Sequence, residues 1–168
     1  MIVRPGTAAD AEAIARVHVQ SWQTTYKGLV PDGFLQNLTV QRRAEQWRAA
    51  LTIHQDTNHI FVAEMDEDGI VGFVASGAVR DGRREYTAEI FAIYLTRTSQ
   101  GRGLGRLLFE AAVADLKQRG HPSMMLWVLA DNPSRGFYER MGGLPIDEKE
   151  IELGGLMLKE VAYGWKEI

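Results

Sequence analysis

A glycine-rich stretch in the second half of the sequence carries residue types that suit anion binding. It lies between an apolar run at residues 88–95 and a segment whose apolar residues recur at helical spacing from residue 104 to residue 119. Glycines let the backbone approach a ligand and adopt positive φ, and the first turn of a helix offers unpaired N–H groups and a positive dipole end. This order of strand, turn and helix predicts an anion site formed by Gln100, Gly101, Arg102, Gly103, Leu104, Gly105 and Arg106.

The spacing of these residues excludes two common phosphate loops. A Walker loop ends in Gly-Lys-Ser/Thr, whereas Gly105 is followed by Arg106 and Leu107, and the dinucleotide fingerprint would need a glycine at position 106. The pattern Q/R-x-x-G-x-G/A is satisfied by Gln100, Gly103 and Gly105. In this respect the sequence resembles the GNAT superfamily of N-acetyltransferases, whose turn holds the pyrophosphate of acetyl-CoA.

The flanking segments strengthen this resemblance. Residues 89–105 resemble the family's fourth strand and phosphate loop, residues 126–143 resemble its next strand and helix, and the two come in the family's order and spacing. The resemblance implies an α/β (α+β) GNAT fold, in which a mixed, mostly antiparallel sheet of about seven strands is flanked by helices. It also implies a splay between the fourth and fifth strands, where the pantetheine arm of acetyl-CoA inserts like a missing strand.

The resemblance assigns cofactor contacts to several residues. The backbone of Ile93, Tyr94 and Leu95 is expected to bond the pantetheine amides and to donate an N–H to the thioester oxygen, and Asn132 is expected to touch the same arm. Arg102 and Arg106 either add charge near the phosphates or are solvated helix positions. No metal site is expected, because no other histidine stands at a metal-binding spacing to His18 and the sequence has no cysteine.

Glu89 is the candidate general base. An amine with a pKa of about 10.4 is mostly protonated at neutral pH, and freeing its lone pair costs roughly 4.6 kcal/mol. Glu89 is charged within an otherwise apolar strand, at a position where many GNAT members carry a glutamate near the acceptor. The alternative is a structural role, in which Glu89 pairs with an arginine at the start of the strand.

Tyr138 is the candidate general acid. A leaving thiolate is helped by a proton, and a phenol with a pKa of about 10 is a suitable donor. Tyr138 occupies the position of the family's tyrosine acid on the helix after the fifth strand. The alternative is that its ring merely packs beside Phe137. With no cysteine to form an acyl-enzyme, direct attack in a ternary complex is favoured over a ping-pong route.

The acceptor is less well defined than the donor. Trp22 and Tyr26 lie in an aromatic-rich connection, residues 22–32, which resembles one wall of the acceptor site in GNAT enzymes, although both rings could simply fill core. The leading hypothesis is acetylation of a primary amine on a small molecule. Acetylation of a protein N-terminus or lysine is the alternative within the enzyme class, and a non-catalytic acyl-CoA-binding module is the alternative outside it.

Composition limits the remaining classes of function. The 168 residues suit one domain, residues 1–168, with 45% hydrophobic and 24% charged residues. A net charge of −3 argues against a nucleic-acid partner, and no apolar run is long enough to span a membrane.

The first residues lack the apolar core of a signal peptide, so a cytoplasmic location is expected. A homodimer through a strand edge or the final hairpin remains open.

The elements that position these residues follow from periodicity. Thr7 and Thr39 are expected to cap two helices, and residues 59–95 alternate as three antiparallel strands with turns at residues 66–69 and 81–85. The helix from Leu104 connects to a parallel strand at residues 124–129. Asn132 and Pro133 are expected to begin a helix that ends near residue 141, and residues 146–165 should close the chain as a hairpin.

Overall fold

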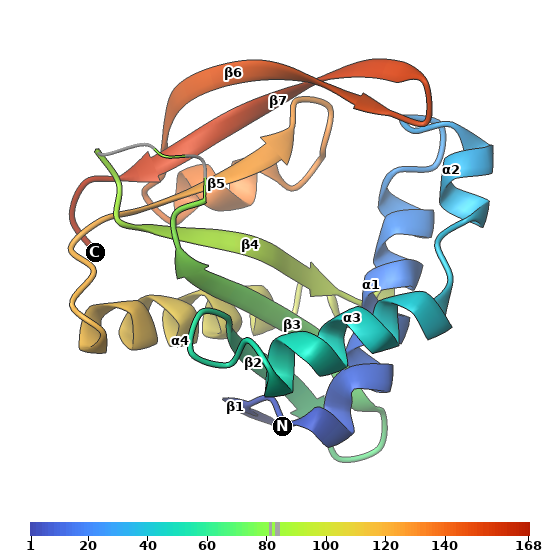
Figure 1. The fold of residues 1–168 in the computed structure, drawn as a ribbon, viewed down its shortest axis with the longest axis horizontal. Coiled ribbons are helices and arrows are strands. Elements are labelled where there is room, and N and C mark those ends of the chain that lie inside the picture. Colours follow the sequence, from blue (N-terminus) through green and yellow to red (C-terminus); the bar gives the residue numbers. More distant parts are fainter. Residues whose placement is uncertain (81, 83–84) are drawn as a thin grey trace.

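The computed structural model describes residues 1–80, 82 and 85–168 (Figure 1). Its sheet has the order β1-β2-β3-β4-β5-β7-β6, and every neighbouring pair is antiparallel except β4 and β5. The strands are β1 (Ile2–Pro5), β2 (His59–Met65), β3 (Gly69–Ala78), β4 (Ala88–Leu95), β5 (Met124–Leu129), β6 (Leu144–Leu153) and β7 (Leu156–Trp165). The predicted mixed, mostly antiparallel sheet is confirmed. The turn predicted at residues 81–85 falls mainly on residues outside the described part of the chain.

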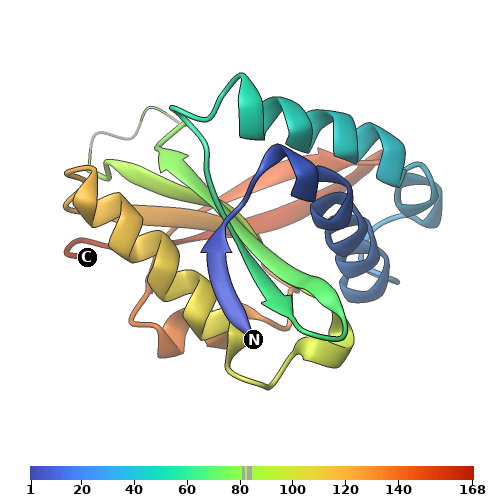
Figure 2. The same ribbon diagram turned by 90° about the horizontal axis from the view of Figure 1, so that it is seen from below.

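Helices cover both faces of the sheet. Figure 2 shows α4 on one side of β1 to β4, with α1 and α3 on the other. The helices are α1 (Ala11–Thr25), α2 (Asp32–Gln36), α3 (Val40–Thr52), α4 (Leu104–Gln118) and α5 (Arg135–Arg140), with short 3-10 turns at Ala8–Asp10 and Arg97–Ser99. Side-chain alternation explains the two layers, because Val62 packs with Ile14 of α1 whereas Ala63 packs with Leu104 of α4. No helix in the described ranges is both long and apolar enough to cross a membrane.

The apolar stripe of α4 anchors the glycine-rich turn to the sheet. Leu104, Leu108, Ala112 and Leu116 recur every four residues and are almost completely buried. Leu107, which the helical spacing grouped with them, is 41% exposed instead. It lies about 300° around the helix from Leu104, at the edge of the stripe, where the sheet does not reach it. The first residue of α4 is thus fixed by core packing, and this fixes the end of the turn.

The sheet opens between β4 and β5. Only two residue pairs join these strands, Ala88 with Met124 and Glu89 with Met125. Beyond them β5 pairs with β7 along its whole length, while β4 pairs only with β3. The edge of β4 that faces β5 therefore has open backbone groups from about residue 90 onward, and the predicted splay is confirmed.

Two predicted boundaries need correction. The last short helix begins at Arg135 rather than Pro133, because Arg135 and Phe137 donate to carbonyls three residues back, so the chain first passes through tight turns. The side chain of Asn132 accepts a bond from Ser134 N at 2.8 Å and so caps this turn. The connection expected from residue 22 begins only after Thr25, and Trp22 lies on the last turn of α1, in line with the helical stripe on which its spacing placed it.

The start of the chain is tied down by a buried carboxylate. Arg4 donates to both oxygens of Asp10, at 2.8 and 3.0 Å, and the backbone N–H of Thr7 donates to Asp10 Oδ2 at 2.8 Å. The hydrogen bonds from Arg4, together with those from Thr7, outweigh burial and lower the pKa of Asp10 from 3.8 to about 2. Because the lowered pKa belongs to the folded state, the resulting stability is present above pH 4 and is lost as the pH falls from about 4 to about 2.

We expect Asp10→Asn to lower the free energy of unfolding at pH 7 by about 2 kcal/mol, which is the shift in pKa expressed as energy. The difference from the wild type should shrink to roughly 0.4 kcal/mol at pH 2, where the wild-type carboxyl is half protonated, and should vanish below that pH. Urea unfolding at several pH values measures both quantities. Glu12→Gln is the matched control, since Glu12 forms an exposed pair with Arg16 at 3.5 Å. A loss that is the same at every pH would contradict the prediction.

Candidate active site

A cavity of about 1290 Å³ extends from the glycine-rich turn, along the open edge of β4, to the β6–β7 hairpin. Most of the residues predicted for the site line it, namely Trp22, Tyr26, Glu89, Ile93, Tyr94, Leu95, Gln100, Gly101, Gly103, Gly105, Arg106, Asn132 and Tyr138. Two others do not. The side chain of Leu104 is buried in the core, and Arg102 is exposed with its Nη1 3.9 Å from the sulfur of Met65. Leu104 can therefore contribute only its backbone.

The glycine-rich turn has the backbone geometry of an anion site. Gly101 and Gly103 have φ values of 72° and 81°, and Gly103 is the N-cap of α4. The N–H groups of Leu104 and Gly105 follow in the first helical turn, where no acceptor exists within the helix. Arg106 lines the cavity, but its Nε donates to Glu110 at 2.7 Å on the exposed face of α4. The backbone, with the helix dipole, is thus the main source of positive potential here.

The C-terminal end of β4 is held by the side chains around it. The carbonyl of Leu95 accepts bonds from Ser21 Oγ at 3.1 Å and from Gln100 Nε2 at 3.4 Å. The hydroxyl of Tyr94 accepts a bond from Trp22 Nε1 at 2.9 Å. Residue Phe91 is an extra residue in the ladder, because Ala92 pairs with Ala75 whereas Ile90 pairs with Ser76. This bulge twists the strand and aims its open edge at the cavity.

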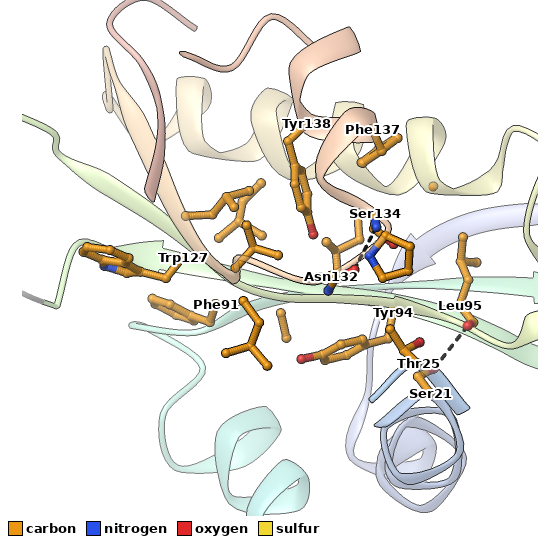
Figure 3. Close-up of a pocket in the computed structure, with 18 of the residues that line it drawn as sticks. Ser21, Thr25, Phe91, Tyr94, Leu95, Trp127, Asn132, Ser134, Phe137 and Tyr138 are labelled. Atoms are coloured by element: carbon orange, nitrogen blue, oxygen red, sulfur yellow. Dashed lines mark hydrogen bonds between the residues drawn. The ribbon is translucent and has the colours of Figure 1, made fainter. Parts of the chain in front are cut away.

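Tyr138 projects into the middle of the cavity. Its ring packs edge-on against Phe137 with 5.4 Å between centroids, and its hydroxyl points toward Asn132 and β4 (Figure 3). Within the described residues this hydroxyl makes no hydrogen bond. Burial raises the pKa of Tyr138, with a smaller electrostatic contribution from Tyr94, so the phenol stays protonated at neutral pH. The ring of Tyr138 is thus packed against Phe137 while its hydroxyl keeps its proton, so the two interpretations of this residue do not exclude each other.

Tyr26 and Asn132 join α1 to the segment that follows β5. Asn132 Nδ2 donates to the hydroxyl of Tyr26 at 2.9 Å, and the rings of Trp22 and Tyr26 lie 4.7 Å apart. Burial raises the pKa of Tyr26, and hydrogen bonding to Asn132 only partly offsets this. Both aromatic residues belong to a core cluster with Val30 and Leu129 and also line the cavity. They therefore fill core and form a wall of the cavity at once.

Glu89 lies at the point where β4 and β5 separate. Its carboxylate is buried and accepts three bonds from Arg80, from N at 3.1 Å, Nε at 3.2 Å and Nη2 at 2.7 Å. Arg80 follows β3 and is exposed, and its guanidinium carbon lies 4.0 Å from the centroid of Phe91. Glu89 thus has an arginine partner and also borders the cavity.

Sequence reasoning missed four residues at the end of the cavity nearest the β6–β7 hairpin, which we call the hairpin end. Trp127 and Phe91 lie there, far from Leu95 (Figure 3). Lys149 of β6 and Glu160 of β7 border the same space. Glu160 could have been identified from strand alternation, which places it on the same face of the strand as the apolar residues Leu158 and Ala162. In the described part of the chain, no group of three His, Cys, Asp or Glu residues could hold a metal ion.

Comparison with known proteins agrees with this geometry. The family model described as Acetyltransferase (GNAT) family matches residues 19–143. An uncharacterised N-acetyltransferase of Bacillus subtilis, YuaI, is 34% identical over 166 residues, which cover 99% of this chain and 93% of the relative. A mycothiol acetyltransferase of Rhodococcus jostii is 32% identical over 106 residues, which cover 61% of this chain and only 32% of that protein.

Solved structures share the fold at low sequence identity. The ribosomal-protein-alanine N-acetyltransferase of Brucella melitensis superposes with a TM-score of 0.77 at 20% identity, covering 98% of this chain and 99% of that one. YncA of Salmonella typhimurium, a putative acetyltransferase solved with acetyl-CoA, gives 0.73 at 19% identity, covering 98% and 92%. The family model and the Bacillus relative each span most of the sequence, so the chain belongs to the GNAT family of acetyltransferases.

Proposed function

We propose that this protein transfers the acetyl group of acetyl-CoA to a primary amine of a small molecule, by direct attack in a ternary complex. The observation that carries the proposal is the continuity of one cavity from the glycine-rich turn, past the open edge of β4 and the hydroxyl of Tyr138, to Glu89. YncA, which shares the fold, was solved with acetyl-CoA, and this supports the choice of donor. Residues 1–168 act as one catalytic domain in this proposal.

The donor occupies the half of the cavity bordered by α4. The N–H groups from Gly101 to Gly105 bind the pyrophosphate, whereas the N–H of Arg106 already donates to the carbonyl of Gly103 at 3.1 Å. The open edge of β4 at residues 93–95 bonds the pantetheine amides as a neighbouring strand would. An N–H of the same edge stabilises the negative charge that develops on the thioester oxygen. One such donor typically lowers the barrier by about 3 kcal/mol. Asn132 and Tyr138 border the sulfur end of the arm.

The chemistry needs proton transfers at the nitrogen and at the sulfur. Glu89 first takes a proton from the acceptor ammonium, directly or through water, and passes it to solvent. The neutral amine then attacks the thioester carbon, so a C–N bond forms and the C–S bond breaks. The nitrogen loses its second proton to Glu89 by the same route, and the departing sulfur takes a proton from Tyr138. Solvent exchange then returns each residue to its starting state. The products are the acetylated amine and CoA.

The positive φ of Gly103 allows a separate test of the pyrophosphate site. A Cβ at Gly103 would meet no heavy atom within 4 Å, so Gly103→Ala costs only backbone strain, about 1–2 kcal/mol. We expect the altered turn to weaken CoA binding about tenfold, measured by isothermal titration calorimetry. Gly120→Ala is the matched control, because Gly120 has a φ of 83°, equally open surroundings and a place at the far end of α4. Equal CoA affinity in both variants would contradict the assignment.

Acetylation of a protein N-terminus is a second candidate function. A ribosomal protein bS18-alanine N-acetyltransferase of Haemophilus influenzae is 29% identical over 94 residues, which cover 56% of this chain and 61% of that protein. A peptide acceptor would enter at the hairpin end, between Trp22 and the β6–β7 hairpin. The two candidates differ in acceptor size and share the donor site.

Thiol release from acetyl-CoA tests the proposal. The acceptor panel comprises polyamines, amino acids, aminoglycosides and a peptide that begins with alanine. Turnover with a small amine supports the leading proposal, and turnover confined to the peptide supports the second candidate. CoA binding with no thiol release from any amine would contradict both and favour a binding module.

A further inference from the structure

The hairpin end of the cavity contains a pair of oppositely charged residues on an aromatic floor. Lys149 Nζ lies 4.0 Å from the centroid of the Trp127 ring and 3.4 Å from Glu160 Oε2. Lys149 and Glu160 are directly opposite each other in the β6–β7 ladder, so the backbone fixes their spacing. At 3.4 Å the ion pair is longer than a typical charge-assisted hydrogen bond. A small change in the lysine side chain is therefore enough to open it.

The same arrangement recurs across the cavity. Arg80 lies over the ring of Phe91, and its Nη2 is 2.7 Å from Glu89 Oε1. In both pairs the carboxylate is the inner partner, since the side chains of Glu89 and Glu160 are 5% and 18% exposed. The cations lie outside, with the side chains of Arg80 and Lys149 63% and 43% exposed. An acceptor that arrives from solvent thus meets positive charge first and negative charge further in.

Charge balance restricts which amines this arrangement accepts. Among the described residues, each of these two carboxylates is paired with a cation, so a diamine would add two positive charges to pairs that are already balanced. Uncompensated charge in a partly buried site is costly. A molecule with one ammonium and one carboxylate adds no net charge. It can enter the Lys149–Glu160 pair by exchange, with its ammonium on Glu160 and its carboxylate on Lys149.

The position of Glu160 suits this exchange. Glu160 lines the cavity together with Tyr26, and its side chain is less exposed than that of Lys149. An ammonium bound by Glu160 therefore lies on the inner side of the pair. Trp127 provides an apolar surface for the carbon chain between the two charges.

We propose that the acceptor is a zwitterion, an amine that also carries a carboxylate, and that Lys149 and Glu160 select it. This inference rests on the proposed acetyl transfer, because it assigns the acceptor of the same site. Lys149 binds the acceptor carboxylate and Glu160 guides the ammonium, which then loses its proton before attack. Glu89, beside Arg80 on the opposite wall, takes that proton, directly or through water.

Binding to the CoA-loaded protein tests the acceptor class without turnover. Three ligands present a primary amine on a similar short chain and differ in the group at the other end. This group is anionic in β-alanine, neutral in β-alaninamide and cationic in diaminopropane. Isothermal titration calorimetry should show β-alanine binding about tenfold more tightly than the other two, the typical effect of one hydrogen bond to a charged group. Equal affinities, tighter binding of diaminopropane, or no binding of β-alanine would overturn the proposal.

Variants of Lys149 connect this preference to the ion pair. Lys149→Gln should abolish the preference for β-alanine, and Lys149→Arg should keep it, since the charge remains. Lys159→Gln is the matched control, because Lys159 pairs with Glu148 at 3.0 Å on the same hairpin and does not line the cavity. A preference that survives Lys149→Gln would contradict the role of this residue.

Thiol release measured beside binding separates this inference from the proposed function. Turnover that shows no preference for β-alanine over diaminopropane would contradict the acceptor class and leave acetyl transfer supported. Preferential binding of β-alanine without thiol release from any amine would support the acceptor site and contradict acetyl transfer.

Discussion

Replacement of Tyr138 by phenylalanine is expected to lower kcat for acetyl transfer about a hundredfold and to leave the affinity for CoA nearly unchanged. The variant keeps the ring, which packs against Phe137, and removes only the hydroxyl, which donates to no group in the described residues. Folding stability should therefore change little. Steady-state kinetics, CoA titration and thermal unfolding measure the three quantities.

The pH dependence gives the Tyr138 prediction a second readout. Because burial raises the pKa of Tyr138 above its ordinary value of 10.0, the wild-type enzyme should keep this acid protonated throughout the range from pH 7 to pH 10. The defect of Tyr138→Phe should accordingly stay constant over that range. A falling limb below pH 10 that disappears in the variant would contradict the raised pKa.

Tyr163→Phe is the control for the loss of a buried tyrosine hydroxyl. The hydroxyl of Tyr163 donates to Glu139 at 2.7 Å and accepts a bond from Arg135 at 3.0 Å, and Tyr163 does not line the cavity. We expect this variant to lose about 1 kcal/mol of stability and to retain most of its activity. If Tyr138→Phe behaves in the same way, Tyr138 packs the core and is not the acid.

Local patterns in the sequence were sufficient to predict most elements of the fold. Alternation along residues 59–95 predicted three strands, and the turn between the first two is confirmed, with Gly69 at a φ of 67°. Helical spacing from Leu104 predicted α4, and Thr39 caps α3 through the N–H of Arg42. These features depend on neighbouring residues only, so they are visible without knowledge of the tertiary structure.

Features that depend on register were not predictable in the same way. The bulge at Phe91 shifts the alternation of β4, so Tyr94 packs with Phe91 on the side of α1 while Leu95 packs on the side of α4. A second irregularity, between Pro145 and Asp147, sets which residue of β6 faces Glu160. A one-residue slip moves a side chain to the other face, so the hairpin end of the cavity could not be assembled from sequence alone.

Glu89→Gln is expected to lower kcat/KM at pH 7 about a hundredfold, equivalent to about 2.7 kcal/mol of barrier. The amide keeps the size of the side chain and its place beside Arg80 but cannot accept a proton from the acceptor. The defect should shrink as the pH rises, because an amine with a pKa of about 10.4 then loses its proton to solvent. Activity measured from pH 7 to pH 10 checks this trend.

The ion pair with Arg80 supplies the matched variant for this test. Arg80→Gln breaks the same contact and leaves the Glu89 carboxylate in the cavity wall. If Glu89 is the base, Arg80→Gln loses stability but keeps much more activity than Glu89→Gln, and its activity does not recover selectively at high pH. If Glu89 serves only to hold Arg80, the two variants lose similar stability and similar activity at every pH. Arg80→Gln keeps the Glu89 carboxylate and Glu89→Gln removes it. A difference between the pH profiles of these two variants can therefore come only from a catalytic role of Glu89.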